Sequence, residues 1–363
     1  MDPVDDDPNG DLDLDFPPLS FDHLAGWAED DHLAAFRAFL KSCERDALGS
    51  PRTGPFPSEE ALALGADIDN DTARNFFETH FTPRCRYDSR GDGFVTGYYE
   101  PVVRGARQPS AQYSVPVYGR PDDLVPLSGS EDLYRALHND RISARPNCGY
   151  ELEDYFTRAE IEDGALQGRG LELLYLDDWI ESFFMHVQGS GLVQLDDGTQ
   201  VRLSFAGKNG HPYTSIARQL VDRREIGPRQ IDMERIKAWL RADPARGRAL
   251  LQENQSYIFF RELSGEEGRH GPLGAQSVPL TAGRSLAIDP VCTPLGCPIY
   301  LVADNLLTEK GPEFARLMIG QDVGSAIRGP ERGDIFWGTG EAAGASAGTT
   351  RNLAIFIFLL PKP

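Results

Sequence analysis

With 363 residues, the chain is long enough for two domains that each bury a hydrophobic core of their own. Its net charge of -20 at pH 7 argues against a nucleic-acid partner, because phosphate binding needs clustered Lys and Arg side chains. The 37 glycines and 26 prolines accompany few long helical patterns, so we expect a mainly β protein with peripheral helices, an α+β fold.

The start of the chain is strongly acidic. Seven aspartates stand within residues 2–15, beside Pro and Gly, which predicts a disordered, solvated tail over residues 1–18. This start lacks the basic, then apolar, then small-residue order of a secretory signal. No run of about 18 apolar residues follows, so we expect no membrane-spanning helix.

Helical patterns come next. Apolar residues at helical spacing predict an amphipathic helix over Asp31–Leu48, and Phe76 and Phe77 give the helix expected at Thr72–His80 its apolar side. Later helix starts are expected where an acidic or hydroxyl cap precedes the first turn. These starts are Asp177–Ile180, Thr214 or Ser215, and Asp243–Pro244.

Several stretches carry β signals. Phe94–Pro101 predicts a strand that ends at proline, Leu192–Leu203 predicts a hairpin turning at Asp197–Gly198, and Ser204–Tyr213 is expected to be a polar loop. From Ser256 onward, the spacing of short apolar runs predicts a closed barrel rather than an open sheet. Its six strands would be Tyr257–Phe260, Ser285–Ile288, Ile299–Val302, Arg316–Ile319, Ile335–Trp337 and Leu353–Leu359.

The five cysteines form no CxxC pair and no Cys/His spacing suited to zinc. Cys292 and Cys297 flank a tight Thr-Pro-Leu-Gly turn that could bring them within disulfide reach. We expect that bridge in an oxidising compartment and two buried thiols in cytosol.

Three aspartates share one context in the β-rich third of the chain. Asp289 and Asp322 follow predicted strands, and Asp334 precedes an apolar strand. A barrel could gather these side chains at one rim, where burial and mutual repulsion raise the pKa of one carboxyl and make it a proton donor. For Asp322 and Asp334, the alternative is that they merely cap turns beside glycine. A metal site is the weaker interpretation, since no His and no EF-hand spacing lies nearby.

Other chemistries have less support. Glu181 followed by Ser182 resembles the proton donor of helical lysozyme-like enzymes, but a solvated glutamate on a helix face is favoured. No G-x-S-x-G elbow surrounds Ser182, Ser190 or Ser215, which argues against a serine hydrolase. The two Gly-x-Gly stretches, Gly189–Gly191 and Gly338–Gly340, lack the strand–turn–helix context of dinucleotide binding, so we predict no cofactor.

A third pattern is the placing of aromatic, amide and cationic side chains in glycine-rich, polar segments. Aromatic faces beside amides and hydroxyls suit sugar rings, which are apolar on one face and rimmed with hydroxyl groups. Together with a candidate acid they predict a saccharide groove. The residues concerned are Tyr98, Tyr99, Gln188, Lys208, Asn209, Tyr213 and Trp337.

Five motifs together resemble the membrane-bound lytic murein transglycosylase A family. They run in order between about Phe94 and Leu360 and cover most of the chain. The motifs are Thr96–Pro101 (TGYYEP), His186–Gly191 (HVQGSG), Phe205–Tyr213 (FAGKNGHPY), Asp322–Gly329 (DVGSAIRG) and Gly333–Gly338 (GDIFWG).

The resemblance implies a fold and a division of the chain. The C-terminal part looks like the family's three-aspartate domain, a double-psi β-barrel, whose aspartates would be Asp289, Asp322 and Asp334. It implies a barrel domain of residues 1–103 with 254–363, an inserted β-rich domain of residues 104–253, and a substrate groove between them. It also adds Thr96, Gly97, Gly189, Ser190, Ala326 and Gly338 to the expected substrate-binding residues.

The implied activity is cleavage of the β-1,4 bond between N-acetylmuramic acid and N-acetylglucosamine in peptidoglycan, leaving a 1,6-anhydro end. Asp334 would be the single acid and base, with Asp322 and Asp289 in support. The sugar's own C6 hydroxyl would then replace the second carboxylate of ordinary glycosidases. Two alternatives stay open. One is a hydrolytic endoglycosidase with Asp322 as base, and the other is a non-catalytic module that binds cell-wall polysaccharide.

The resemblance also implies a location and partners. Members of the family are usually lipoproteins, although this sequence shows neither a signal nor an acylated N-terminal cysteine. We therefore expect a periplasmic protein whose full-length form is attached to the outer membrane. Peptidoglycan strands are the implied partner, with no nucleic acid, a monomeric state, and other cell-wall enzymes as further candidates.

Overall fold

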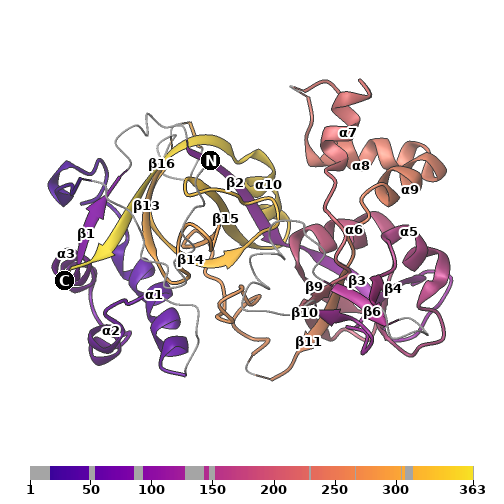
Figure 1. Cartoon of the computed structure of the whole chain (residues 1–363), viewed down its shortest axis with the longest axis horizontal. Helices are drawn as coiled ribbons and strands as arrows, with labels where there is room; N and C mark the ends of the chain where they lie inside the picture. Colours follow the sequence, from indigo (N-terminus) through magenta and orange to yellow (C-terminus); the bar gives the residue numbers. More distant parts are fainter. Residues whose placement is uncertain are drawn as a thin grey trace.

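The computed structural model describes residues 17–48, 54–85, 93–126, 143–146, 152–228, 230–265, 267–303, 305–306 and 314–362. These residues form a closed barrel at the centre of the molecule, a second sheet to one side, and helices at both ends (Figure 1). The expected acidic tail lies almost wholly outside the described residues, as does Cys148.

The barrel strands follow the order β1-β16-β13-β14-β12-β15-β2. An additional pairing of β16 with β2 closes six of these strands into a ring, with β1 attached outside it. Two of the pairings, β12 with β14 and β15 with β2, are parallel. The strands are β1 (Phe81–Arg84), β2 (Gly93–Glu100), β12 (Ser285–Ile288), β13 (Pro298–Ala303), β14 (Phe314–Val323), β15 (Arg332–Thr339) and β16 (Arg351–Pro361).

The second sheet has the order β11-β10-β9-β3-β8-β4, and a small sheet of β5, β6 and β7 accompanies it. The predicted hairpin is confirmed as β9 paired with β10, with Gly198 at a φ of +85° in its turn. The strands are β3 (Val102–Ala106), β4 (Val115–Tyr118), β5 (Val125–Pro126), β6 (Ser143–Pro146), β7 (Leu152–Asp154), β8 (Glu172–Leu176), β9 (Ser190–Leu195), β10 (Gln200–Lys208) and β11 (Ile258–Leu263).

Two sequence expectations in this region were wrong. The strand expected at Tyr257–Phe260 does not join the barrel, because β11 pairs with β10 instead. The polar loop expected at Ser204–Tyr213 is strand as far as Lys208. An irregularity between Phe205 and Gly207 interrupts the strand alternation there, so the sequence pattern reads as a loop.

The expected helix starts are confirmed by side-chain caps. Asp31, Asp178, Ser215 and Asp243 each accept a backbone N–H bond in the first turn of the helix that follows. The helices are α1 (His32–Asp46), α2 (Ser58–Leu64), α3 (Asn70–His80), α5 (Arg158–Glu160), α6 (Trp179–Gln188), α7 (Ile216–Asp222), α8 (Met233–Ala242), α9 (Pro244–Gln252) and α10 (Glu341–Thr349), with single turns at Phe21–His23 and Ile161–Ala165. None of the described helices is long and apolar enough to cross a bilayer.

One hydrophobic core joins the barrel interior to the N-terminal helices. Phe36 and Phe39 of α1 pack edge-on against Phe77 of α3, and Phe39 also packs against Phe81 of β1. Separate clusters lie under the second sheet and among α6 to α9. Cys292 and Cys297 are not joined in a disulfide, and burial raises the pKa of the Cys297 thiol above its usual range.

A buried ion pair fixes the N-terminal segment to the barrel. Arg284 donates to both carboxylate oxygens of Asp30, at 2.8 and 2.9 Å, and to the carbonyl oxygen of Leu317. Asp30 also accepts a bond from the backbone N–H of Leu317. Both carboxylate oxygens and both Nη groups of the pair are therefore used, which offsets the cost of removing two charges from water.

We predict that Asp30→Ala lowers the free energy of unfolding by about 3–5 kcal/mol, because it leaves the Arg284 charge buried without its partner. Chemical denaturation measures the loss. Glu267→Ala, which breaks the exposed pair with Arg261, is the control and should cost less than about 1 kcal/mol. Equal effects of the two substitutions would contradict the prediction.

Candidate functional site

The three candidate aspartates lie at or next to the ends of neighbouring barrel strands. Asp322 pairs with Ala287 of β12, Ala287 pairs with Asp334 of β15, and Asp334 pairs with Thr96 of β2. In-register partners point to the same face of a sheet, and neighbouring strands lie about 4.8 Å apart. The register therefore puts Asp322, Asp334 and Thr96 in one row, with only the small Ala287 side chain between the two acids.

Asp334 has a strongly raised pKa. Burial raises its pKa to about 6. The hydrogen bond from Thr96 and the positive charge of Arg332 oppose the rise, while the charge of Asp322 adds to it. A carboxylic acid with this pKa keeps a substantial protonated fraction near neutral pH, as a general acid requires.

Thr96 controls which oxygen of Asp334 is available. Its hydroxyl donates to Asp334 Oδ1 at 2.6 Å, while Arg332 Nη2 donates to the same hydroxyl oxygen at 2.8 Å. A hydroxyl has a single proton, so an arginine on its oxygen directs that proton to the carboxylate. Oδ1 is thus occupied as an acceptor, and Oδ2 is the oxygen left to carry an exchangeable proton.

Asp322 has a different environment. Its Oδ1 accepts bonds from the backbone N–H groups of Ala275 and Val323, both at 2.9 Å, and its Oδ2 accepts a bond from the Tyr98 hydroxyl at 2.7 Å. Burial raises the pKa of Asp322, and these three bonds oppose the rise. Burial beside Asp322 likewise raises the pKa of Tyr98 well above its usual range, which keeps the phenol a donor.

Asp289 holds a loop in place. It directly follows β12, is only 4% exposed, and accepts the backbone N–H of Gly329 at 2.7 Å and that of Val291 at 3.1 Å. Gly329 lies in the connection between Asp322 and Asp334, so Asp289 fixes the path of that connection. Its hydrogen bonds are those of a residue that supports the site, and a direct part in catalysis stays a prediction.

Several predicted binding residues join the second sheet to the barrel. Gln188 ends α6 and its Oε1 accepts the backbone N–H of Tyr99 in β2 at 3.0 Å. Gly189 follows with a φ of +82° and turns the chain into β9, where Ser190 is buried. These residues therefore lie beside the strand that carries Thr96 and Tyr98.

Trp337 and Tyr99 have partners inside the fold. The Trp337 indole donates to Thr350 Oγ1 at 3.0 Å and lies against Gly97, where a Cβ would come within 2.6 Å of the indole nitrogen. Tyr99 is 9% exposed and packs under α10. Gly338 has a φ of +112°, which favours glycine. The use of both rings as stacking surfaces for sugars stays a prediction.

The remaining predicted residues lie in two places. Asn209 is buried and bonds to the carbonyl oxygens of Phe156 and Gln255, so its amide holds neighbouring loops together. Tyr213 lies beside the cap of α7, and burial raises its pKa. Lys208 is buried at the end of β10, and Ala326 is exposed in the connection between β14 and β15.

Sequence reasoning missed Arg332 and Glu100. Arg332 precedes Asp334 by two residues, so strand alternation alone places it on the same face. Glu100 is fully buried and accepts bonds from Arg202 at 2.8 Å and Thr339 at 2.7 Å. Both partners are distant in the sequence, so no local pattern predicts them. The rival acid Glu181 forms ion pairs with Lys237 and Arg241, which supports the structural interpretation.

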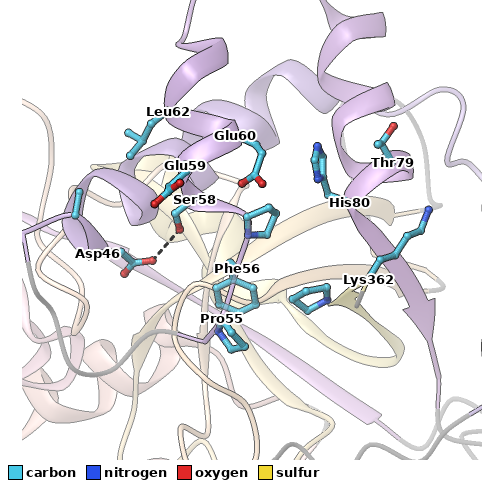
Figure 2. A pocket seen from close by; sticks show the side chains of 13 residues that line it. Asp46, Pro55, Phe56, Ser58, Glu59, Glu60, Leu62, Thr79, His80 and Lys362 are labelled. Carbon is cyan, nitrogen blue, oxygen red and sulfur yellow. Dashed lines mark hydrogen bonds between the residues drawn. The ribbon is translucent and has the colours of Figure 1, made fainter.

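A cavity of about 930 Å³ lies elsewhere (Figure 2). It is lined by the ends of α1 and α3, by α2, and by Pro361 and Lys362 at the C-terminal end of β16. Thr96 pairs with Arg351 at the other end of β16, whose 11 residues span roughly 35 Å when extended. The cavity is thus separate from the carboxyl row. Among the described residues, no group of three or more His, Cys, Asp or Glu side chains is placed to hold a metal ion.

Two family models match this chain. Residues 94–261 match the family described as the MltA specific insert domain, and residues 284–360 match the 3D domain. The membrane-bound lytic murein transglycosylase A of Vibrio cholerae is 35% identical over 72% of this chain, a stretch that spans 63% of the Vibrio protein.

Two solved structures are also similar. A membrane-bound lytic murein transglycosylase from Agrobacterium tumefaciens has a TM-score of 0.84 and 35% identity, covering 95% of this chain and 97% of its own. The Escherichia coli MltA with bound chitohexaose has a TM-score of 0.66 and 28% identity, covering 90% of both chains.

The raised pKa of Asp334 predicts a pH-dependent effect on stability. A carboxyl whose pKa rises from 3.8 to about 6 on folding stabilises the fold at low pH, and this stabilisation is lost as the pH rises through 6. Asp334→Asn has no carboxyl to titrate, so its stability does not fall in this way as the pH rises. The difference in the free energy of unfolding, variant minus parent, should therefore be about 2–3 kcal/mol more favourable to the variant at pH 8 than at pH 4. Denaturation at both pH values measures this, and a pH-independent difference would contradict it.

Proposed function

This chain belongs to the membrane-bound lytic murein transglycosylase A family, and we propose that it cleaves the β-1,4 bond between N-acetylmuramic acid and N-acetylglucosamine in peptidoglycan, leaving a 1,6-anhydromuramic acid end. The observation that carries the proposal is Asp334, a half-buried carboxyl with a pKa of about 6 and one oxygen already fixed by Thr96.

In the proposed reaction, Asp334 acts twice. Its protonated Oδ2 gives a proton to the glycosidic oxygen as the bond to the muramic acid C1 breaks and an oxocarbenium-like state forms. The carboxylate then removes the proton from the C6 hydroxyl, whose oxygen bonds to C1. Because that hydroxyl is tethered to the reacting ring, proximity replaces the second catalytic carboxylate.

The environment of Asp322 supports this mechanism over hydrolysis. A hydrolytic enzyme needs a carboxylate that is open to a water molecule. Both oxygens of Asp322 already accept hydrogen bonds, two of them from rigid backbone groups. We therefore propose that Asp322 orients Tyr98 and polarises the site, while Asp289 fixes the connecting loop.

The substrate and the setting are part of the same proposal. We propose that glycan strands lie in a groove between the barrel domain (1–103 with 254–363) and the inserted domain (104–253). The E. coli relative was solved with chitohexaose, a linear sugar chain, which supports a binding site of this kind. We also propose a monomeric, periplasmic protein that is attached to the outer membrane in its full-length form; the relatives' description as membrane-bound supports the attachment to a membrane. Other cell-wall enzymes stay candidate partners.

Asp334→Asn should lower the release of anhydro-muropeptides from purified sacculi by about a hundredfold or more, the usual value of a general acid–base. Mass spectrometry of the products measures the release, and it separates a lyase from a hydrolase because hydrolytic products are heavier by one water. Glu181→Gln, at the ion-paired acid, is the control and should keep its activity. Full anhydro-product release by the Asp334 variant would refute the assignment.

Thr96→Val should move the alkaline limb of kcat/KM to higher pH by about one pH unit, because the lost hydrogen bond stabilises the carboxylate form of Asp334. The acid form must donate, so in the parent activity falls as the pH rises through about 6. Thr96→Ser keeps the hydroxyl and should restore the parent profile. An unchanged or downward-shifted limb in the valine variant would contradict this role of Thr96.

A further inference from the structure

Lys208 is a cation in an unusual position. It ends β10 and is only 8% exposed, yet among the described residues it has neither a hydrogen-bond acceptor nor an acidic partner for its ammonium group. Its backbone is well fixed, since the next residue, Asn209, bonds to Phe156, Gln255 and Tyr257. Most of this side chain is removed from water, but its ammonium nitrogen is not among the fully buried, unpaired polar atoms and so stays open to a group from outside the chain.

The other buried Lys and Arg side chains of the described chain are paired. Arg284 binds Asp30, and Arg158 binds Glu162 as well as two carbonyl oxygens. Even the partly buried Arg202 has the carboxylate of Glu100. The chain has a net charge of -20, so it has many Asp and Glu side chains that could pair with a lysine. Among the described residues, Lys208 has no such partner, which suggests that its ammonium group binds an anion from outside the chain.

The charge that acts on Lys208 is another cation, Arg328. Burial and the Arg328 charge lower the pKa of Lys208 to about 8, so the ammonium form still prevails at neutral pH. Arg328 lies in the connection between β14 and β15, six residues from both Asp322 and Asp334. Its guanidinium donates to the Ser325 carbonyl oxygen at 3.1 Å, and the neighbouring Gly329 is tied to Asp289. Lys208 of the second sheet and Arg328 of this connection are therefore close enough for their charges to interact.

We propose that Lys208 and Arg328 form a carboxylate-binding subsite for the muramic acid side of the substrate, an inference that rests on the proposed function. The sugar rings of the glycan are uncharged, so the anionic groups lie on the lactyl arm at C3 of muramic acid. The ligand is either the free lactyl carboxylate of a peptide-free strand or a carboxylate of the attached peptide. A carboxylate between the two cations removes their repulsion and satisfies the lysine. The subsite thus selects murein over uncharged glycans such as chitin.

Binding can be measured without cleavage in the Asp334→Asn protein. Calorimetry would compare three glycans of equal length: a chitooligosaccharide, a murein strand with free lactyl carboxylates, and a murein strand with peptides. Lys208→Met should weaken carboxylate-bearing glycans about tenfold or more, as expected for a charged hydrogen bond, and change chitooligosaccharide binding less than about twofold. Lys237→Met, which removes an ion-paired lysine, is the matched control and should change nothing.

Each outcome is decisive. A selective loss on peptide-free strands assigns the lactyl carboxylate, and a selective loss on peptide-bearing strands alone assigns the peptide. An equal effect on all three glycans, or none, overturns the subsite and leaves the proposed function intact. Failure of the parent to bind any glycan overturns the proposed function and this inference with it. If Lys208→Met does not fold, Arg328→Gln on the facing loop should give the same selective loss.

Discussion

The arrangement of the site depends on one buried carboxylate, Glu100, at the point where the chain leaves the barrel. It ends β2, is fully buried, and receives Arg202 of β10 on one oxygen and Thr339 of β15 on the other. Because a buried charge is tolerated only when its partners are in place, this network favours one orientation of β10 relative to β2 and β15. Lys208, six residues along β10 from Arg202, is thereby held at a defined position beside the barrel.

Two carboxyls of the same row acquire different chemistry from their hydrogen bonds. Both are partly buried, and the loss of water around them raises both pKa values. Asp322 accepts three bonds that use both of its oxygens, whereas the hydrogen bond from Thr96 to Asp334 occupies Oδ1 alone. The same desolvation therefore gives one oriented, fully engaged acid and one acid with an oxygen free for proton transfer. The two carboxyls differ mainly because they accept different numbers of hydrogen bonds, and less because their charges repel each other.

Local patterns in the sequence predicted much of this structure. Caps such as Asp31 and Asp178, the hairpin at Asp197–Gly198 and most barrel strands follow from interactions within a few residues. The partners of β11 and Glu100 could not be found this way, because they depend on which distant strand lies alongside. The three aspartates were identified as one rim, but the order Asp322–Ala287–Asp334–Thr96 needed the register. That register includes an irregularity that no alternation pattern encodes.

This irregularity explains how Asp322 comes to face the row. Gly320 pairs with Leu286 and Asp322 pairs with Ala287, so Gln321 is an extra residue on β14, a β-bulge. Gln321 is fully buried and bonds to Ser285, to the Ala38 carbonyl oxygen and to Ser42 of α1. The bulge thus turns one side chain back onto the N-terminal helix and the next toward the rim. Helix α1 lies far from Asp322 in the sequence, yet it supports the acidic row through these contacts. Losing the contacts to Gln321 would destabilise the bulge that orients Asp322.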